Sequence, residues 1–240
     1  MLIKADFHIH STVSPCASLL MSPQNIVAAA QEQGLSLISL TDHNCTRNCP
    51  TFFSLCQKAG LFCLGGAEVT TCEECHVLCL FEDLGTIMEF GEYAEAHLPD
   101  IHNQPGIFGD QVYVNEEEEV LGFVEKYLGN ATTISFYDLC KKVKDRGGLV
   151  IPAHVDRLVF GLISQLGFIP PEPIVDALEV YHASCSAVNL GQHPYVLVSS
   201  SDAHLPQDIG CVYNEIEMPA LSFSCLKEAF KQKKVFIRMR

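Results

Sequence analysis

The sequence has few basic residues and no long hydrophobic run. Its 240 residues include 15 Lys and Arg against 29 Asp and Glu, a formal net charge of −14. A surface this acidic repels polyanions, so we do not expect long nucleic acids or anionic membranes as partners. No segment reaches eighteen consecutive apolar residues, so no membrane span is predicted. The first residues also lack the apolar stretch of a signal peptide, and we expect a cytoplasmic protein.

Internal repeats and low-complexity linkers are missing as well. Hydrophobic residues make up 48% of the chain and charged residues 18%, which is typical of an ordinary globular protein. A chain of this length can bury a substantial core. We therefore expect a single domain over residues 1–240.

The chain is rich in cysteine, with twelve residues of this type. In a reducing cytoplasm these are expected to be thiols, and several lie in apolar runs where Cys acts as a small hydrophobe. Two short-spaced pairs, Cys45 with Cys49 and Cys72 with Cys75, could in principle form a four-thiolate zinc or iron–sulfur site. Because supporting turn residues are missing, buried free thiols are the preferred interpretation.

Apolar runs alternate with helical segments along the chain. One helix is expected to start at Ser22 as N-cap with Pro23 in its first turn, and to end at Gly34. Another is expected over residues 51–59, ending at Gly60. This rhythm favours a largely parallel α/β sheet or a (β/α) barrel, with an open doubly wound sheet as the alternative. Strands are expected at 2–10, 35–43, 61–71, 75–81, 149–154, 177–183, 195–204 and 211–218, and two further helices at 135–148 and 222–234.

Residues 83–133 break this alternation. The stretch "QVYVNEEEEVLGFVE" is typical of two short strands joined at an acidic turn. The run Glu116–Glu119 lacks the Asp/Asn/Gly spacing of a calcium loop, so a solvated turn is the better interpretation. We expect an insertion with a hairpin, packed against the main fold.

Histidines and carboxylates gather where the expected strands end or begin. Each alone has an ordinary explanation, such as a helix cap or an ion pair. At the mouth of a parallel barrel, however, the strand ends converge, and burying so many imidazoles and carboxylates together is unfavourable unless cations satisfy them. The set comprises His8, His10, Asp42, His43, Glu68, His76, His154, Asp202 and His204.

This ligand set consists of imidazoles and carboxylates, which suit Zn²⁺, Mn²⁺ or Fe²⁺. It is larger than one ion uses, so a multinuclear site with a bridging carboxylate is expected. In such sites the ions convert water into hydroxide at neutral pH and clamp a phosphoryl oxygen.

Six segments in this order, "DFHIHSTVSPCA", "LTDHN", "GAEVTT", "CHVLCLF", "IPAHVDR" and "SSDAH", resemble the PHP (polymerase and histidinol phosphatase) superfamily of metal-dependent phosphoesterases. The resemblance spans nearly the whole chain. It implies a distorted seven-stranded (β/α) barrel with two or three divalent metal ions at the C-terminal mouth.

The resemblance also implies how the ligands are shared among the ions. His8, His10, Glu68 and Asp202 would hold one ion; Glu68 would bridge to a second ion held by His76 and His154; His43 and His204 would hold a third. Asp6 and Asp42 would orient imidazoles by accepting their free N–H groups. Similar proteins usually place a further His or Asp for the third ion where this chain has Pro15 and Cys16. We expect Cys16 to serve as a thiolate ligand; otherwise the third ion is weak or absent.

Three further residues are candidates for contact with a substrate. Arg47 and Arg157 are the basic residues nearest the motifs, and either could bind a phosphate with two hydrogen bonds. His182, at another strand end, could protonate a leaving group or contact the substrate.

Together these features predict a hydrolase that cleaves a phosphomonoester or phosphodiester of a small molecule or nucleotide by metal-activated hydroxide. Two alternatives remain at this point. One is a metal hydrolase of the amidohydrolase type, although such enzymes often use a carboxylated lysine and no lysine falls in the strand-end motifs. The other is a non-catalytic metal-binding module.

Overall fold

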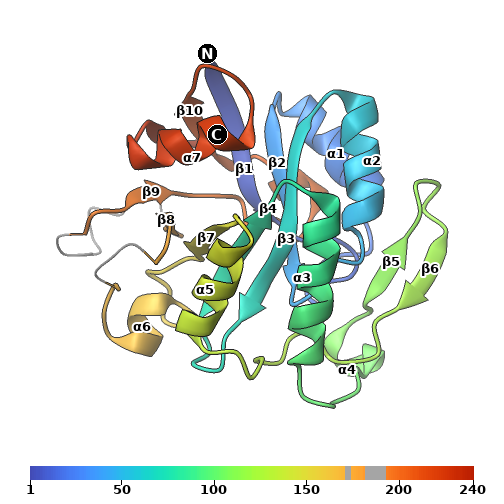
Figure 1. The fold of residues 1–240 in the computed structure, drawn as a ribbon. Helices are drawn as coiled ribbons and strands as arrows, with labels where there is room; N and C mark the ends of the chain where they lie inside the picture. Colours follow the sequence, from blue (N-terminus) through green and yellow to red (C-terminus); the bar gives the residue numbers. More distant parts are fainter. Residues whose placement is uncertain (171–173, 182–192) are drawn as a thin grey trace.

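The computed structural model describes residues 1–170, 174–181 and 193–240. Its centre is a curled, mixed sheet of seven strands in the order β11-β10-β1-β2-β3-β4-β7 (Figure 1). The chain forms one α/β domain around this sheet. The strands are β1 (Leu2–Ile9), β2 (Leu37–His43), β3 (Phe62–Thr70), β4 (His76–Phe81), β7 (Leu149–Pro152), β10 (Val212–Glu217) and β11 (Val235–Met239).

The directions of the strands correct the expectation of a largely parallel sheet. β1, β2 and β3 are parallel, but β4 is antiparallel to both β3 and β7, and β10 is antiparallel to β1 and β11. The link between β3 and β4 is a short turn over residues 71–75, which can join only antiparallel strands. For this reason His76, which begins β4, lies at the same edge of the sheet as Glu68 near the end of β3.

The sheet is closed into a distorted barrel by a short parallel pair, β8 (Ala177–Glu179) and β9 (Val196–Val198). On one side the Asp176 N–H donates to the Val150 carbonyl of β7 at 2.8 Å. On the other, an isolated parallel bridge joins Ala203 to Ile9 of β1. Closure therefore depends on a few isolated backbone bonds rather than on continuous ladders, which confirms the predicted distorted barrel.

Two of the expected helices have the predicted capping residues at one end, Ser22 at the start of the first and Gly60 at the end of the second. In α1 (Pro23–Glu32) the Ser22 hydroxyl accepts the Asn25 N–H, and the chain turns at Gly34 with φ +66°. The next helix, α2 (Cys49–Ala59), ends at Gly60 in the left-handed conformation that glycine adopts without strain. The remaining helical segments are α3 (Leu84–Ala96), α4 (Pro105–Phe108), α5 (Phe136–Asp145), α6 (Leu162–Leu166), the 3-10 turn η1 (Pro206–Asp208) and α7 (Phe223–Lys231).

Two apolar clusters lie on opposite faces of the strands. In β4, Val77 and Cys79 join the cluster packed beneath α1, α2, α3 and α5, whereas Leu78 and Leu80 join the cluster packed against α7. This alternation is the period-two pattern of a strand buried on both faces. No helix in the described part of the chain combines the length and hydropathy of a membrane span.

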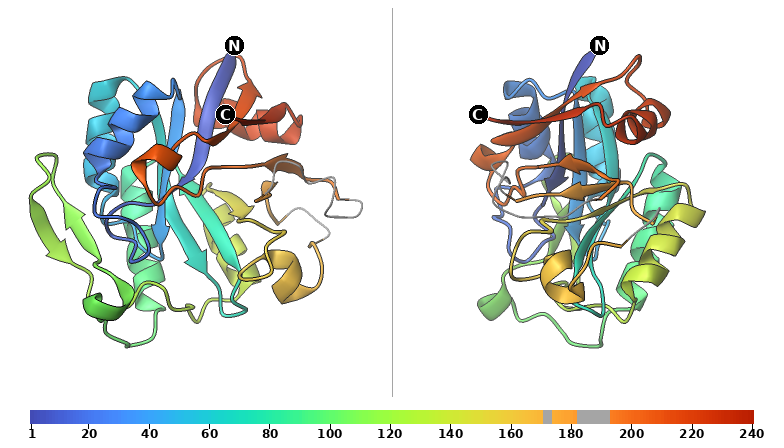
Figure 2. Two further views of the ribbon diagram at one scale, coloured as in Figure 1. Left: turned by 180° about the vertical axis from the view of Figure 1, so that it is seen from behind. Right: turned by 90° about the vertical axis from the view of Figure 1, so that its left-hand side faces the viewer.

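The region 83–133 contains two helices and the expected hairpin. Its first segment, α3, is a core helix, since Phe90 packs against Phe81 of β4 with ring centroids 5.0 Å apart. The expected hairpin follows as β5 (Val112–Val114) and β6 (Val120–Phe123), an antiparallel pair joined through an acidic turn. It projects beside the helices rather than extending the main sheet (Figure 2).

Candidate metal centre

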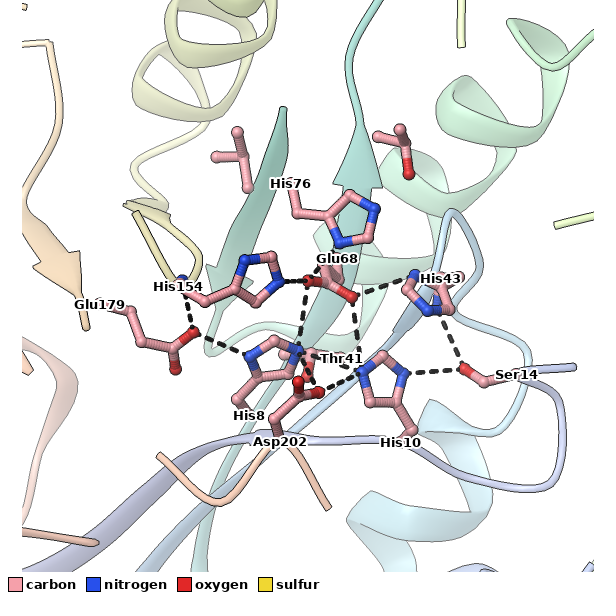
Figure 3. Close-up of polar contacts among 12 residues, drawn as sticks. His8, His10, Ser14, Thr41, His43, Glu68, His76, His154, Glu179 and Asp202 are labelled. Carbon is pink, nitrogen blue, oxygen red and sulfur yellow. Dashed lines mark hydrogen bonds and ion pairs between the residues drawn. The ribbon is translucent and has the colours of Figure 1, made fainter. Parts of the chain in front are cut away.

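Glu68 lies at the centre of a buried cluster of histidine and carboxylate side chains, at the edge of the sheet where β1, β2 and β3 end (Figure 3). Its side chain is 1% exposed, and imidazole nitrogens from four strand ends approach its two carboxylate oxygens. Asp202 Oδ1 lies 3.3 Å from the Nε2 atoms of both His8 and His10. The distances to Glu68 are 3.4 Å from His8 Nε2, 3.4 Å from His10 Nε2, 3.0 Å from His43 Nδ1, 2.9 Å from His76 Nδ1 and 3.2 Å from His154 Nε2.

Two of these residues have backbone conformations that L-amino acids rarely adopt. The φ angle is +31° at His154 and +50° at Asp202, each in the turn that follows a strand. A non-glycine residue at positive φ is strained, and such strain gathers at functional sites. The backbone here is held so that both side chains point into the cluster.

Hydrogen bonds fix the orientation of the His8 ring. Its Nδ1–H donates to Glu179 Oε2 at 2.9 Å, because a carboxylate can only accept. Its Nε2 therefore faces the cluster, among the oxygens of Glu68 and Asp202. This carboxylate–histidine pair is the arrangement that orients histidine ligands in metal sites.

The His10 ring is oriented through a hydroxyl. Ser14 Oγ donates to Asp42 Oδ1 at 2.7 Å and accepts the backbone N–H of His43 at 3.1 Å. His10 Nδ1, 3.0 Å from Ser14 Oγ, must therefore donate, which leaves a lone pair on Nε2. Burial lowers the pKa of His10 to about 3, so this ring is neutral at pH 7.

The atoms that face one another are thus acceptors, and they require a positive charge between them. His8 Nε2 and His10 Nε2 are 3.1 Å apart, both beside the Glu68 and Asp202 carboxylates. Burial opposes protonation of His8, yet Glu179, Asp202 and Glu68 hold its pKa well above its ordinary value. A proton supplies the charge in the metal-free protein, and a divalent cation fits the same donor set.

The surroundings of Glu68 also favour a positive charge beside its carboxylate. Burial would raise its pKa, but the surrounding imidazoles of His76, His8 and His43 hold that pKa well below its ordinary value. His43 Nδ1 is a buried atom 3.0 Å from Glu68 Oε2, and it has no hydrogen-bond partner among the described residues. Both atoms are positioned to share a cation rather than a hydrogen bond.

Three overlapping groups of side chains could each hold a metal ion, with their ligand atoms within 4.8 Å of one another. The third group contains Cys16, whose Sγ lies 3.1 Å from His204 Nε2. Burial would raise the pKa of this thiol, but hydrogen bonds with His204 and His43 lower it to about 7. The groups are His8–His10–Glu68, His43–Glu68–His76 and His10–Cys16–His43–His204.

Two predicted orienting residues act differently from the expectation. Asp6 accepts the backbone N–H groups of Ser201 at 3.1 Å and Gly210 at 3.0 Å, so it holds the loop of Asp202 rather than an imidazole. Asp42 accepts from Ser11 and Ser14, and it reaches His10 only through the Ser14 hydroxyl. The prediction that both carboxylates accept imidazole N–H groups directly was wrong.

The cluster of histidines and carboxylates opens into a cleft of about 560 Å³, and one of the two predicted arginines lines it. Arg157 Nη1 lies 3.2 Å from Asp202 Oδ2, with the guanidinium 5.0 Å from the centre of the Tyr181 ring. Arg47 instead forms a two-pronged ion pair with Glu95, at 2.9 and 2.7 Å, in a separate surface pocket. The prediction that Arg47 binds phosphate is therefore not supported by its position.

Two other predictions concern His182 and the possible four-thiolate site. His182 lies outside the described residues. Within them, Cys45, Cys49, Cys72 and Cys75 belong to none of the groups that could hold a metal ion, and all four are free thiols. The alternative of a four-thiolate site is thus set aside.

Sequence reasoning missed two residues that orient the ligands. Glu179 ends β8, the same position that revealed the other acidic candidates, so a sequence signal was present. Ser14 gave none, because a serine in a loop has no spacing that links it to a distant carboxylate.

Fold and site together define the class of this protein, an α/β barrel whose mouth carries clustered histidines and carboxylates that could hold metal ions. Residues 6–232 match the sequence model of the PHP domain. The chain belongs to the PHP domain family.

Three known proteins illustrate the relationship. The chain is 29% identical over 165 residues to the uncharacterised protein YqxK of Bacillus subtilis, a match that covers 65% of this chain and 36% of that protein. It is 23% identical over 219 residues to an uncharacterised protein of Methanocaldococcus jannaschii, covering 88% and 98% of the two chains. The crystal structure of a lesion-specific endonuclease from Pyrococcus furiosus superimposes with a TM-score of 0.71 at 20% identity, covering 99% of this chain and 58% of that one. The chain thus spans about a third of the Bacillus protein and somewhat more than half of the endonuclease.

Proposed function

We propose that this protein is a metal-dependent hydrolase of phosphate esters. The observation that carries the proposal is the convergence of acceptor atoms on one buried point. His8 Nε2 and His10 Nε2, 3.1 Å apart, stand beside the Glu68 and Asp202 carboxylates, an arrangement to which a divalent cation supplies the positive charge. Membership of the PHP domain family supports the same class.

The proposed ligands follow the groups that the geometry brings together. Glu68 is placed to bridge, because both of its oxygens face imidazoles from different strands. When bound, divalent cations such as Zn²⁺, Mn²⁺ or Fe²⁺ acidify water and neutralise charge on a phosphoryl oxygen. The proposed sets are His8, His10, Glu68 and Asp202; Glu68, His76 and His154; and His43, His204 and Cys16.

Arg157 is proposed to bind the phosphate group of the substrate. Its side chain is 39% exposed and lies in the cleft that leads to the ligands. In the absence of substrate it pairs with Asp202, so the guanidinium is held at the rim and can exchange this carboxylate for a phosphate oxygen. Arginine suits this role because its planar group matches two phosphate oxygens at once.

We propose a small phosphorylated molecule as the substrate class. The net charge of −14 disfavours long nucleic acid, which binds mainly through basic surfaces. The endonuclease of similar fold is described as lesion-specific, and at 20% identity that likeness concerns the fold. A DNA substrate is therefore kept as a separate outcome of the test.

The test uses protein freed of metal by chelation and reloaded with Zn²⁺, Mn²⁺ or Fe²⁺. Phosphate or alcohol release is measured on phosphomonoesters, phosphodiesters and nucleotides, amine release on simple amides, and strand cleavage on an oligonucleotide duplex with an abasic site. We expect turnover of small phosphoesters that chelation abolishes and metal restores. Turnover of amides alone, or of the duplex alone, would overturn the proposal, as would metal-loaded protein without any turnover.

Glu68→Gln and Glu95→Gln provide the matched pair of variants for this test. Both exchange a carboxylate for an amide of the same shape, but Glu95 pairs with Arg47 away from the cleft. Glu68→Gln is expected to lose turnover and metal together, while Glu95→Gln retains both.

A further inference from the structure

Glu179 lies where two ligand-bearing segments of the chain meet. Its side chain, buried at 3% exposure, ends β8. Oε2 accepts His8 Nδ1–H from β1 at 2.9 Å and the backbone N–H of His154 at 3.1 Å (Figure 3). Its carbonyl oxygen also accepts the Val155 N–H at 2.8 Å. One residue thus holds an imidazole of one proposed metal set and the backbone of another.

The second oxygen of this carboxylate is unusual. Glu179 Oε1 is buried and has no hydrogen-bond partner among the described residues. An ionised carboxylate with an unpartnered buried oxygen is unfavourable unless positive charge lies nearby. The group that Glu179 faces is the His8 ring, whose other nitrogen points at Glu68 and Asp202.

The position of Glu179 in the fold explains why such a contact is needed. The β8–β9 pair is separate from the seven-stranded sheet, and within the described residues isolated backbone bonds, from Asp176 N–H to the Val150 carbonyl and from Val155 N–H to the Glu179 carbonyl, rather than a continuous ladder hold β8 against β7. His154 follows β7 at a strained φ of +31°, a conformation that persists only where neighbours hold it. The bonds of Glu179 to His8 and His154 span this gap.

We propose that Glu179 is a positioning residue of the metal centre, which holds His8 with Nε2 inward and fixes the His154 turn. Its negative charge is compensated by the cation through the His8 ring. The inference rests on the proposed function, since it assumes that the cluster binds metal.

Asp176 supplies a matched control in the same segment. Its carboxylate also bonds to the backbone of β7, accepting the Val150 N–H at 2.8 Å, and it pairs with Lys144 at 2.6 Å. Val150 belongs to β7, away from the His154 turn. Asp176 therefore accepts a backbone N–H across the same pair of segments as Glu179 does, but it has no contact with the histidine cluster.

The experiment measures metal affinity and thermal stability of the metal-free protein in parallel. Titration calorimetry with Mn²⁺ and with Zn²⁺ is applied to wild type, Glu179→Gln and Asp176→Asn. We expect Glu179→Gln to bind metal about 10- to 100-fold more weakly, as found for partners that orient ligands. Its metal-free form is expected to melt at a lower temperature as well, because the carboxylate that pairs with the protonated His8 ring at 2.9 Å is lost, so metal affinity is the measurement that decides. Asp176→Asn is expected to melt lower and to bind metal as wild type does.

Opposite outcomes overturn the inference. Glu179→Gln with unchanged metal affinity and a lowered melting temperature would mean that Glu179 is only structural, while the proposed function stands. Wild-type protein that binds neither metal would overturn the proposed function and this inference with it. Should Glu179→Gln not fold, Glu179→Asp takes its place; it keeps the charge but shortens the reach to His8, and an affinity equal to that of wild type would again overturn the inference.

Discussion

The stability that metal gives to the protein should depend on Glu68. Replacing Glu68 by Gln leaves an isosteric group but removes the charge on which five imidazoles converge. It also places an amide NH₂ where the wild type has an acceptor oxygen, so a cation would meet a donor. We therefore expect Glu68→Gln to lose the stabilisation by metal that the wild type shows.

The magnitude follows from linkage between binding and folding. A ligand present at about 100 times its Kd stabilises the folded state by about 2.7 kcal/mol. For a domain of this size, 1 kcal/mol raises the melting temperature by about 2–4 °C. Wild-type protein should therefore melt about 5–11 °C higher with Zn²⁺ or Mn²⁺ at that concentration than without metal.

Thermal unfolding followed by circular dichroism, on chelated and metal-loaded samples, measures this shift. Glu95→Gln is the control and should keep the full shift, because its ion pair with Arg47 lies in a separate pocket. A shift in Glu68→Gln equal to that of wild type would refute the role of Glu68 as the bridging ligand. The absence of a shift in wild type would refute the metal site itself.

Further perturbations test other parts of the account. In metal-free protein the rate of alkylation of Cys16 by iodoacetamide should have its midpoint near pH 7. The neighbouring imidazoles lower the pKa of this thiol to about 7, although burial acts in the opposite direction. Alkylation should slow as the pH falls through this value, because the reactive thiolate is protonated. Ser14→Ala should weaken metal binding and lower the free energy of unfolding by about 1–3 kcal/mol, because it strips partners from buried groups. Arg157→Ala should reduce kcat/KM on phosphoesters by about 10- to 100-fold, the equivalent of one charge-assisted hydrogen bond, with metal content unchanged. Gly66→Ala should destabilise the protein by about 3 kcal/mol or more in urea unfolding, since its Cβ would lie 1.7 Å from the Cys79 carbonyl oxygen.

Each of these predictions has an outcome that contradicts it. Peptide mapping that finds Cys16 no more reactive at pH 7 than the exposed Cys72, whose pKa is raised by burial and by Glu73, would contradict the first. Wild-type metal affinity in Ser14→Ala would contradict the second. Loss of bound metal in Arg157→Ala would mean that Arg157 supports the metal site rather than binding the substrate. A Gly66→Ala variant that unfolds at the same urea concentration as wild type would contradict the close packing of β3 on β4.

Local patterns made much of the fold predictable from the sequence. Ser22 marks the start of a helix because its hydroxyl accepts a backbone N–H three residues later. Gly60 marks the end of a helix because glycine adopts the left-handed backbone conformation without strain. His8 and His10 could be paired from alternation along a single strand. Strand-end positions then brought in Glu68 and Asp202, since the ends of neighbouring strands meet at one edge.

The remaining features depend on contacts between residues far apart in the chain. Arg47 was assigned to phosphate from its proximity to a motif, but Glu95, 48 positions away, provides a partner of ideal geometry. Asp42 is near His43 in sequence, yet it acts on His10 through Ser14. The antiparallel course of β4 was hidden because a run buried on both faces has no pattern that reveals its direction.

The central claim is that the buried cluster binds divalent metal ions that are needed to hydrolyse a phosphoester. Its most direct test is a titration of metal-free wild-type protein with Mn²⁺ or Zn²⁺ in which bound metal and phosphoester hydrolysis are measured on the same samples. We predict that hydrolysis rises in proportion to the metal bound and saturates when more than one ion per chain is present. Full metal occupancy without hydrolysis of any phosphoester, or hydrolysis that persists at zero metal, would contradict the claim.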